Sequence, residues 1–147
     1  MNIFLLDEDP VKAARYHVDR HVVKMILESA QMLANPLPDS RYRQTHLKHP
    51  CSAWAARTIE NWNWLLSLYL YLHEEWRYRY KHNKTHKSYW ITEAPKPDLP
   101  SEGLTDFPQA MPETYRQEDP VEAYRGYYKA EKGHLAKWTR RRKPPWW

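Results

Sequence analysis

Residues 17–28 read HVDRHVVKMILE, and their pattern predicts a largely buried helix. At about 100° per residue, His17, His21, Lys24 and Glu28 fall on one line along such a helix. Apolar residues occupy most of the remaining circumference, so this polar line faces either solvent or an internal cleft. We interpret it either as a solvated face with a Lys24–Glu28 bridge or as an assembled set of proton donors, acceptors and a cation.

The segments around this helix predict an all-α chain, with about three main helices in a single compact domain. The expected organisation is an N-terminal segment and first helix over 1–34, a long second helix over 50–82, a Pro-rich loop over 91–119, a third helix over 120–138 and a basic aromatic C-terminal arm over 139–147. The apolar lead NIFLL is expected to be extended. A stripe at three- and four-residue steps from Trp54 to Trp76 is expected in the core.

The string EDPV occurs at 8–11 and again at 118–121, and each copy has the pattern of a helix start. Asp9 and Asp119 are expected to act as N-caps, because an aspartate side chain accepts hydrogen bonds from free backbone N–H groups of the first turn. A proline follows each aspartate, at the first helical position, where its missing N–H costs nothing. We interpret the repeated string as one capping motif that occurs twice.

Length and composition exclude several classes. A chain of 147 residues suits one domain, and no apolar run approaches the roughly 18 residues of a membrane span. The start, MNIFLLDEDP, lacks the features of a signal peptide, so we expect a cytoplasmic protein, in the host cytoplasm if it is phage-encoded.

The single cysteine, Cys51, excludes an internal disulfide and a cysteine-rich zinc site. It follows a predicted helix start with His49 nearby, so we weigh a nucleophile against a small buried hydrophobe.

The charges fall into blocks along the chain. Residues 76–90 hold five Lys or Arg and no acid, residues 91–122 hold eight acids and two basic residues, and residues 123–147 hold eight basic residues and one acid. The chain also has eight Trp and eleven Tyr. Basic segments interleaved with aromatic residues favour a nucleic-acid partner, since the cations bind phosphates and the rings stack on bases. The alternative is that the acidic segment packs on the basic ones and neutralises them.

Known catalytic motifs are absent. The chain has no P-loop, no dinucleotide fingerprint and no G-x-S-x-G elbow. The stretch THLKHP places His46 and His49 before the second helix, where free backbone N–H groups would make an anion site. With His17 and His21 they leave a shared metal ion open as an alternative, but no HExxH or Cys/His set accompanies them, and we predict neither a metal nor a cofactor.

The layout resembles a known family. A first helix that carries His, Arg and Glu, a remainder rich in Trp and Tyr, and the C-terminal stretch GYYKAEKGHLAKWT are similar to small phage-encoded proteins and to the pyrimidine-dimer DNA glycosylases of the endonuclease V type. The resemblance implies an all-helical DNA-repair enzyme, a hydrolase that flips a base out of duplex DNA. Its nucleophile would be the N-terminal amine, with a glutamate on the first helix. That family removes its initiator Met, whereas Asn2 usually leaves Met1 in place.

By this resemblance Glu28 is the acid/base group, Met1 supplies the amine, and Arg15, Arg20 and Lys24 face phosphates. We further expect His17 and His21 to orient Glu28 or to bind the opened sugar, and we count Lys24 with them among the catalytic residues. The predicted nucleic-acid-binding residues are Arg15, Arg20, His46, His49, Arg77, Arg79, Lys81, Arg140, Arg141 and Arg142. We therefore predict a DNA glycosylase that acts on a damaged or modified pyrimidine. The alternative is a phage nucleotide-binding protein that sequesters a small nucleotide, such as a host defence signal, without catalysis. A structural phage component is a third possibility.

Overall fold

The computed structural model describes residues 1–147 and is all-helical, as predicted. It contains five α-helices, three short 3-10 helices and no strand. The elements are α1 (Pro10–Tyr16), α2 (Asp19–Ala34), α3 (Pro50–Ala55), α4 (Ile59–Tyr80), η1 (Lys87–Thr92), η2 (Glu113–Tyr115), α5 (Pro120–Lys132) and η3 (Gly133–Leu135). No helix is both long and apolar enough to cross a membrane.

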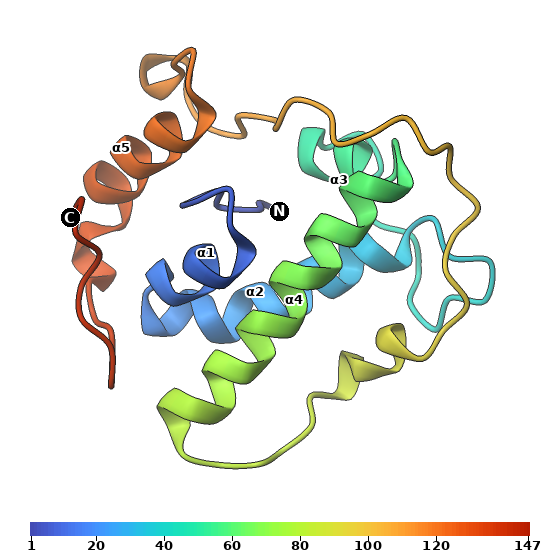
Figure 1. The fold of residues 1–147 in the computed structure, drawn as a ribbon, viewed down its shortest axis with the longest axis horizontal. Helices are drawn as coiled ribbons and strands as arrows, with labels where there is room; N and C mark the ends of the chain where they lie inside the picture. Colours follow the sequence, from blue (N-terminus) through green and yellow to red (C-terminus); the bar gives the residue numbers. More distant parts are fainter.

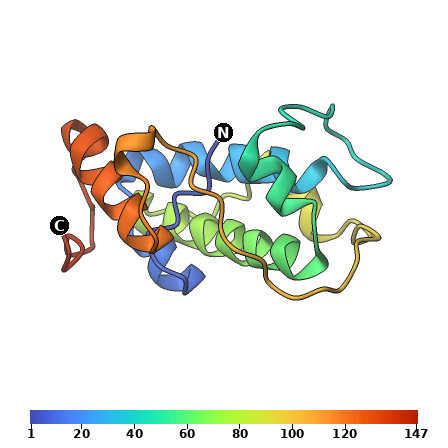
Figure 2. The same cartoon turned by 90° about the horizontal axis from the view of Figure 1, so that it is seen from above.

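Helices α2 and α4 form the two main layers, and α1 also packs on α4 (Figure 1). The predicted apolar lead has no regular secondary structure and runs through the core, where Ile3, Leu5 and Leu6 are fully buried. Figure 2 shows the N-terminus emerging on the α2 side of the molecule, away from α4. The first residue of the chain therefore lies beside the helix that carries the polar line.

The first helix, predicted within residues 1–34, is not one continuous element, because the chain is extended at His17 and Val18. Tertiary partners satisfy the backbone there. The hydroxyl of Tyr128 accepts a hydrogen bond from the Val18 N–H at 3.0 Å, and Arg79 Nη1 donates to the His17 carbonyl at 2.7 Å. Since these groups are bonded outside any helix, the break costs no unpaired backbone group. His17 therefore does not continue the line of α2.

The predicted helix over 50–82 is also split, into α3 and α4. Thr58 caps α4 by accepting from the Asn61 N–H at 3.0 Å, and the Asn61 side chain donates to the Trp54 carbonyl at 2.9 Å. These contacts favour a new helix start over continuation. Helix α4 ends at Tyr80, because Lys81 adopts a left-handed backbone with φ 54°. The predicted core stripe is otherwise confirmed, since its residues from Trp54 to Leu72 are buried and Trp76 is half-buried.

Both predicted aspartate caps are confirmed. Asp9 accepts from the Val11 N–H and Asp119 from the Val121 N–H, each at 2.9 Å. The Pro-rich segment is a loop apart from the ends of η1 and the short η2, and it lies ordered across α3 and the start of α4 (Figure 1).

The predicted third helix over 120–138 is too long, and the tail is no free arm. Helix α5 ends at Lys132, and η3 follows it. The Trp138 indole donates to the Tyr16 carbonyl at 2.9 Å, and the Thr139 hydroxyl donates to Asp19 at 2.6 Å. These contacts dock the tail on the α1–α2 junction, and its tryptophans pack partly buried against the core, which opposes free motion of the tail.

Candidate active site

The amine of Met1 lies 3.1 Å from Glu28 Oε1 on α2. The Met1 side chain is only 3% exposed and packs on the core, whereas the residue as a whole is partly exposed. Its accessible surface is therefore mainly main chain. The Glu28 side chain is 16% exposed, and its Oε2 atom is buried without a hydrogen-bond partner. Together these two groups, which we call the amine–carboxylate pair, form a partly buried ion pair that solvent still reaches.

Asn2 holds the chain at this position. Its side-chain oxygen accepts from the N–H groups of Ile3 at 2.8 Å and Phe4 at 3.0 Å, and its amide donates to the Ala110 carbonyl at 3.0 Å. Phe4 adopts a positive φ of 41°, a conformation that a non-glycine residue rarely takes. Two local bonds and one tertiary bond to Ala110 thus fix the turn after Met1, and the amine is held against Glu28.

A basic pocket adjoins the pair. Lys24 Nζ lies 3.6 Å from Glu28 Oε2, and the Lys24 side chain is 67% exposed. Lys24 also lines a pocket of about 540 Å³ whose walls are Arg20, His21, Val23, Lys24, Tyr80, Lys132 and Leu135. None of these residues is acidic. Neither Arg20 nor Lys132 makes an ion pair within the chain. The pocket is therefore a site of unneutralised positive charge, suited to a phosphate group.

His17 and His21 are neutral core residues. The His17 ring is fully buried, and its Nδ1 atom lies 2.6 Å from the Ala13 carbonyl. Because the chain is extended at His17, before α2 begins, the prediction that His17 shares a line with Glu28 is wrong. Burial lowers the pKa of His17 to about 4. His21 forms part of the pocket floor, stacked on Phe4 with a hydrogen bond of 2.8 Å to the Tyr128 hydroxyl. Burial, and then nearby positive groups, lower its pKa to about 3.

His46 and His49 close a turn that leads into α3. The His49 N–H donates to the His46 carbonyl at 3.0 Å, and His49 Nδ1 accepts from the Cys51 N–H at 3.1 Å. This bond occupies one of the donors that the predicted anion site required, and α3 is only six residues long. Burial first, and then the charge of the Met1 amine, lower the pKa of His49. A neutral imidazole therefore lies near the amine–carboxylate pair.

Several predicted DNA contacts are instead structural. Arg79 is 3% exposed and bonds to Asp19, Glu75 and two backbone carbonyls. Arg141 pairs with Glu75 at 2.5 Å, and both Arg140 and Arg141 lie over the Tyr78 ring. The assignment of Arg79 to phosphates is wrong, because no DNA atom reaches a side chain enclosed by its own partners.

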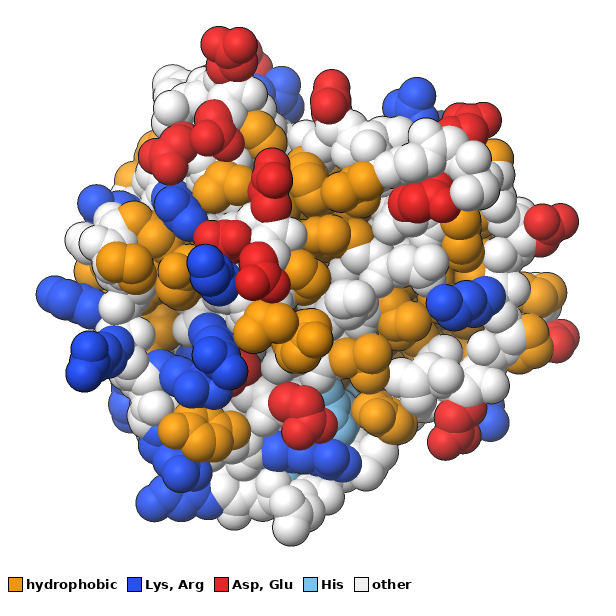
Figure 3. Space-filling view, in the orientation of Figure 1, with side chains coloured by type: hydrophobic (Ala, Val, Ile, Leu, Met, Phe, Trp, Pro, Cys, Tyr) orange, Lys and Arg blue, Asp and Glu red, His pale blue; other side chains and the backbone are white.

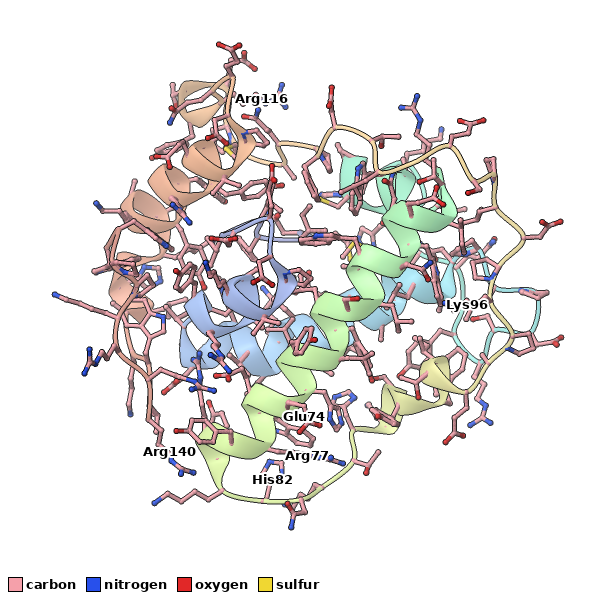
Figure 4. All side chains as sticks on the ribbon, viewed as in Figure 1. Glu74, Arg77, His82, Lys96, Arg116 and Arg140 are labelled. Carbon is pink, nitrogen blue, oxygen red and sulfur yellow. The ribbon has the colours of Figure 1, made fainter.

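The remaining predicted cations lie at several places. Arg77 bonds to Glu74, Thr85 and the Lys84 carbonyl at the carboxyl end of α4 (Figure 4). Figure 3 shows acidic and basic side chains together on this face of the molecule, with the basic ones gathered toward the C-terminal segment. The predicted Lys and Arg residues that are exposed and make no ion pair are Arg15, Arg20, Lys81, Arg140 and Arg142. Among these, only Arg20 lines the basic pocket.

Other chemistry is less favoured by the geometry. Burial raises the pKa of the Cys51 thiol to about 11, so the thiolate that a nucleophile requires is disfavoured. No group of three or more His, Cys, Asp or Glu side chains is arranged to hold a metal ion.

Sequence reasoning missed two contributors to the site, Asn2 as the anchor of the amine and Lys132 as a cation in the pocket. Lys132 lies in the last turn of α5, and no local pattern relates it to α2. No family model, no curated protein and no solved structure matches this chain.

Proposed function

We propose that the protein is a DNA-acting enzyme of the glycosylase type, which processes a flipped, damaged or modified pyrimidine nucleotide. The observation that carries the proposal is the Met1 amine held 3.1 Å from the Glu28 carboxylate at the edge of an acid-free basic pocket. An α-amine is less basic than a lysine ammonium, so more of it is neutral and nucleophilic at pH 7. A carboxylate in contact with it is suited to accept its protons.

In the proposed reaction, the neutral Met1 amine attacks C1′ of the target nucleotide, and the base leaves with the electron pair of the glycosidic bond. Cleavage of the C1′–O4′ bond then gives an imine between Met1 and the opened sugar. Of the two protons that the amine gives up, one goes to the departing base and one to O4′. Glu28 relays them. Water finally hydrolyses the imine, which restores the amine and leaves the sugar aldehyde.

The basic pocket has the residue types that a nucleotide requires. Arg20 and Lys24 lie one helical turn apart on α2, and Lys132 faces them from α5, so phosphates on both sides of the target are neutralised. Tyr80 is 47% exposed and offers a ring for a flipped base. The volume of about 540 Å³ lies within the range of pockets that enclose small ligands.

The test is borohydride trapping of the protein on duplex DNA with and without pyrimidine dimers. We expect a damage-dependent covalent adduct with the wild-type protein. Glu28→Gln should lower the trapping rate by roughly 10²- to 10⁴-fold while DNA affinity changes little, because proton transfer is lost and the phosphate contacts stay. The matched control is Glu74→Gln, which changes an exposed glutamate on α4 and should trap as the wild type does.

A second variant tests the nucleophile. A Gly-Ser extension before Met1 moves the reactive amine away from Glu28, and we expect the adduct to disappear while the fold is retained. Equal trapping with and without the extension would refute Met1 as the nucleophile. If the folded wild type gives no adduct on either DNA but binds a mononucleotide in the pocket, the glycosylase proposal is wrong and the nucleotide-sequestering alternative is favoured.

A further inference from the structure

His21 lies on the floor of the basic pocket, and the residue is only 4% exposed. Two neighbours hold its ring. Phe4 stacks on it at a centroid distance of 4.7 Å, and the Tyr128 hydroxyl lies 2.8 Å from Nδ1. The second ring nitrogen, Nε2, has no hydrogen-bond partner in the chain, and the protein does not enclose it. The proposed chemistry of the amine–carboxylate pair does not use this atom.

The Tyr128 hydroxyl determines which nitrogen of His21 carries the hydrogen. Its oxygen accepts from the Val18 N–H at 3.0 Å, and Tyr128 is fully buried. The hydroxyl hydrogen is left with Nδ1 of His21 as its acceptor, because a buried donor without a partner is costly. When Nδ1 accepts, a neutral imidazole carries its hydrogen on Nε2. Burial lowers the pKa of His21 to about 3, so this N–H is a neutral donor at pH 7.

Three cations line the pocket together with this donor. Arg20 and Lys24 lie one turn apart on α2, and Lys132 comes from the last turn of α5. Lys24 also contacts Glu28, which is shared with the Met1 amine. The pocket and the amine–carboxylate pair thus hold four cations against one carboxylate. A ligand with more than one negative charge balances this excess better than a monoanion does.

The lining consists almost entirely of hydrogen-bond donors. Arginine and lysine have no acceptor, Nδ1 of His21 is occupied, and the Tyr80 hydroxyl donates to the Asp19 carbonyl at 3.3 Å. Val23 and Leu135 add apolar surface. Ionised phosphate oxygens accept hydrogen bonds, so a phosphate matches such a lining. A phosphomonoester carries about −1.5 to −2 charges at pH 7, which is more than the single charge of a phosphodiester.

We propose that the basic pocket binds a terminal phosphate group, a phosphomonoester, with the Nε2–H of His21 as the donor at its floor and the three cationic side chains around it. A mononucleotide and a 5′-phosphorylated DNA end both present this group. The inference goes beyond the proposed function, because it assigns a ligand class to the pocket whether or not the Met1 amine reacts. His21 binds the ligand and transfers no proton.

Isothermal titration of the intact protein tests the ligand class. Thymidine 5′-monophosphate is compared with the dinucleotide TpT, whose only phosphate is a diester. We expect the monophosphate to bind about 10-fold or more tightly than TpT, since charge-assisted hydrogen bonds strengthen with the charge of the acceptor. Equal affinities would overturn the proposal. An oligonucleotide with and without a 5′-phosphate then distinguishes the two sources, because equal affinities of these two strands restrict the pocket to free mononucleotides.

Lys132→Met tests the pocket cations. It should weaken monophosphate binding by about 10-fold, and Lys132→Arg should restore it. The matched control is Lys143→Met, which removes an exposed lysine that makes no ion pair and does not line the pocket, and its affinity should stay within about 2-fold of the wild type. Equal losses in Lys132→Met and Lys143→Met would show a response to net charge alone and would overturn the pocket assignment.

His21→Phe keeps an aromatic ring against Phe4 and removes the donor, so monophosphate affinity should again fall by about 10-fold. This variant also takes the acceptor from Tyr128, and nitrogen-15 NMR of the wild type therefore provides an independent readout. At pH 7 we expect the His21 hydrogen on Nε2, and its signal should shift when inorganic phosphate is added. A hydrogen on Nδ1, or an Nε2–H signal that saturating phosphate does not move, would refute the role of His21.

Borohydride trapping separates this inference from the proposed chemistry. If the monophosphate binds as expected and damaged DNA gives no adduct, the phosphomonoester site is supported and the glycosylase proposal fails. If damaged DNA gives the adduct and the monophosphate binds no more tightly than TpT, the glycosylase proposal stands and the phosphomonoester site is refuted.

Discussion

Replacement of Arg79 by methionine should destabilise the protein severely, although the sequence presents this residue as one more cation in a basic segment. Its guanidinium is enclosed, with Nε 2.8 Å from Glu75, Nη1 3.1 Å from Asp19 and 2.7 Å from the His17 carbonyl, and Nη2 2.9 Å from the Arg15 carbonyl. These bonds connect α4 to the α1–α2 junction. The variant leaves both carbonyls and part of each carboxylate without a donor.

The magnitude follows from burial and from charge balance. Arg79 and Arg141 balance Asp19 and Glu75, so removal of Arg79 leaves one uncompensated negative charge in a network that is mostly buried. Breaking a buried ion pair by removing one partner costs about 3–5 kcal/mol of unfolding free energy. At roughly 2–4 °C per kcal/mol for a chain of this size, the Tm should fall by about 6–20 °C.

Urea and thermal unfolding, followed by circular dichroism and tryptophan fluorescence, measure the loss. Arg20→Met is the control, because Arg20 is exposed and unpaired, and its unfolding free energy should stay within about 0.5 kcal/mol of the wild type. If the protein binds DNA, Arg20→Met should weaken binding and reduce its salt dependence. An unfolding free energy for Arg79→Met within about 1 kcal/mol of the wild type would contradict the buried network.

Three further predictions concern acid sensitivity, thiol reactivity and helix capping. Because burial lowers the pKa of His17 from its ordinary 6.5 to about 4, the unfolded chain takes up a proton at higher pH than the folded one. The contribution of His17 to the free energy of unfolding is therefore complete above pH 6.5, and it falls by up to about 1.4 kcal/mol per pH unit toward pH 4. Equal free energies of unfolding at pH 7 and pH 5 would refute this. Cys51, whose pKa burial raises to about 11, should resist iodoacetamide at pH 8 in the folded protein and react in urea, as mass spectrometry will show. Asp9→Ala and Asp119→Ala should each cost about 1 kcal/mol in urea unfolding, and no loss in either would contradict the caps.

The sequence by itself determined the features that depend on neighbouring residues. The two EDPV strings predict the starts of α1 and α5, because an aspartate cap bonds to an N–H only two residues away. The repeat from Asn61 to Leu72 predicts the buried face of α4, since helix periodicity is a local property. The all-α class follows from such signals alone.

Tertiary structure decided where the helices break and which basic side chains are buried. The chain leaves the helix at His17 because Tyr128 and Arg79 satisfy its backbone, and both residues are far away in sequence. Arg20 and Arg79 have the same side chain, yet one is exposed and the other is buried. Burial depends on which segments pack together, and composition does not contain that information.

The candidate site combines both kinds of determination. Glu28 and Lys24 share a face of α2 through local periodicity, so the sequence predicts their proximity. The amine of Met1 reaches Glu28 only because the apolar lead is buried in the core and Asn2 bonds to Ala110, and Lys132 joins the pocket only because α5 packs beside α2. These residues are not neighbours in sequence, and Asn2 and Ala110 are 108 positions apart, so only the free energy of packing the whole chain brings them together.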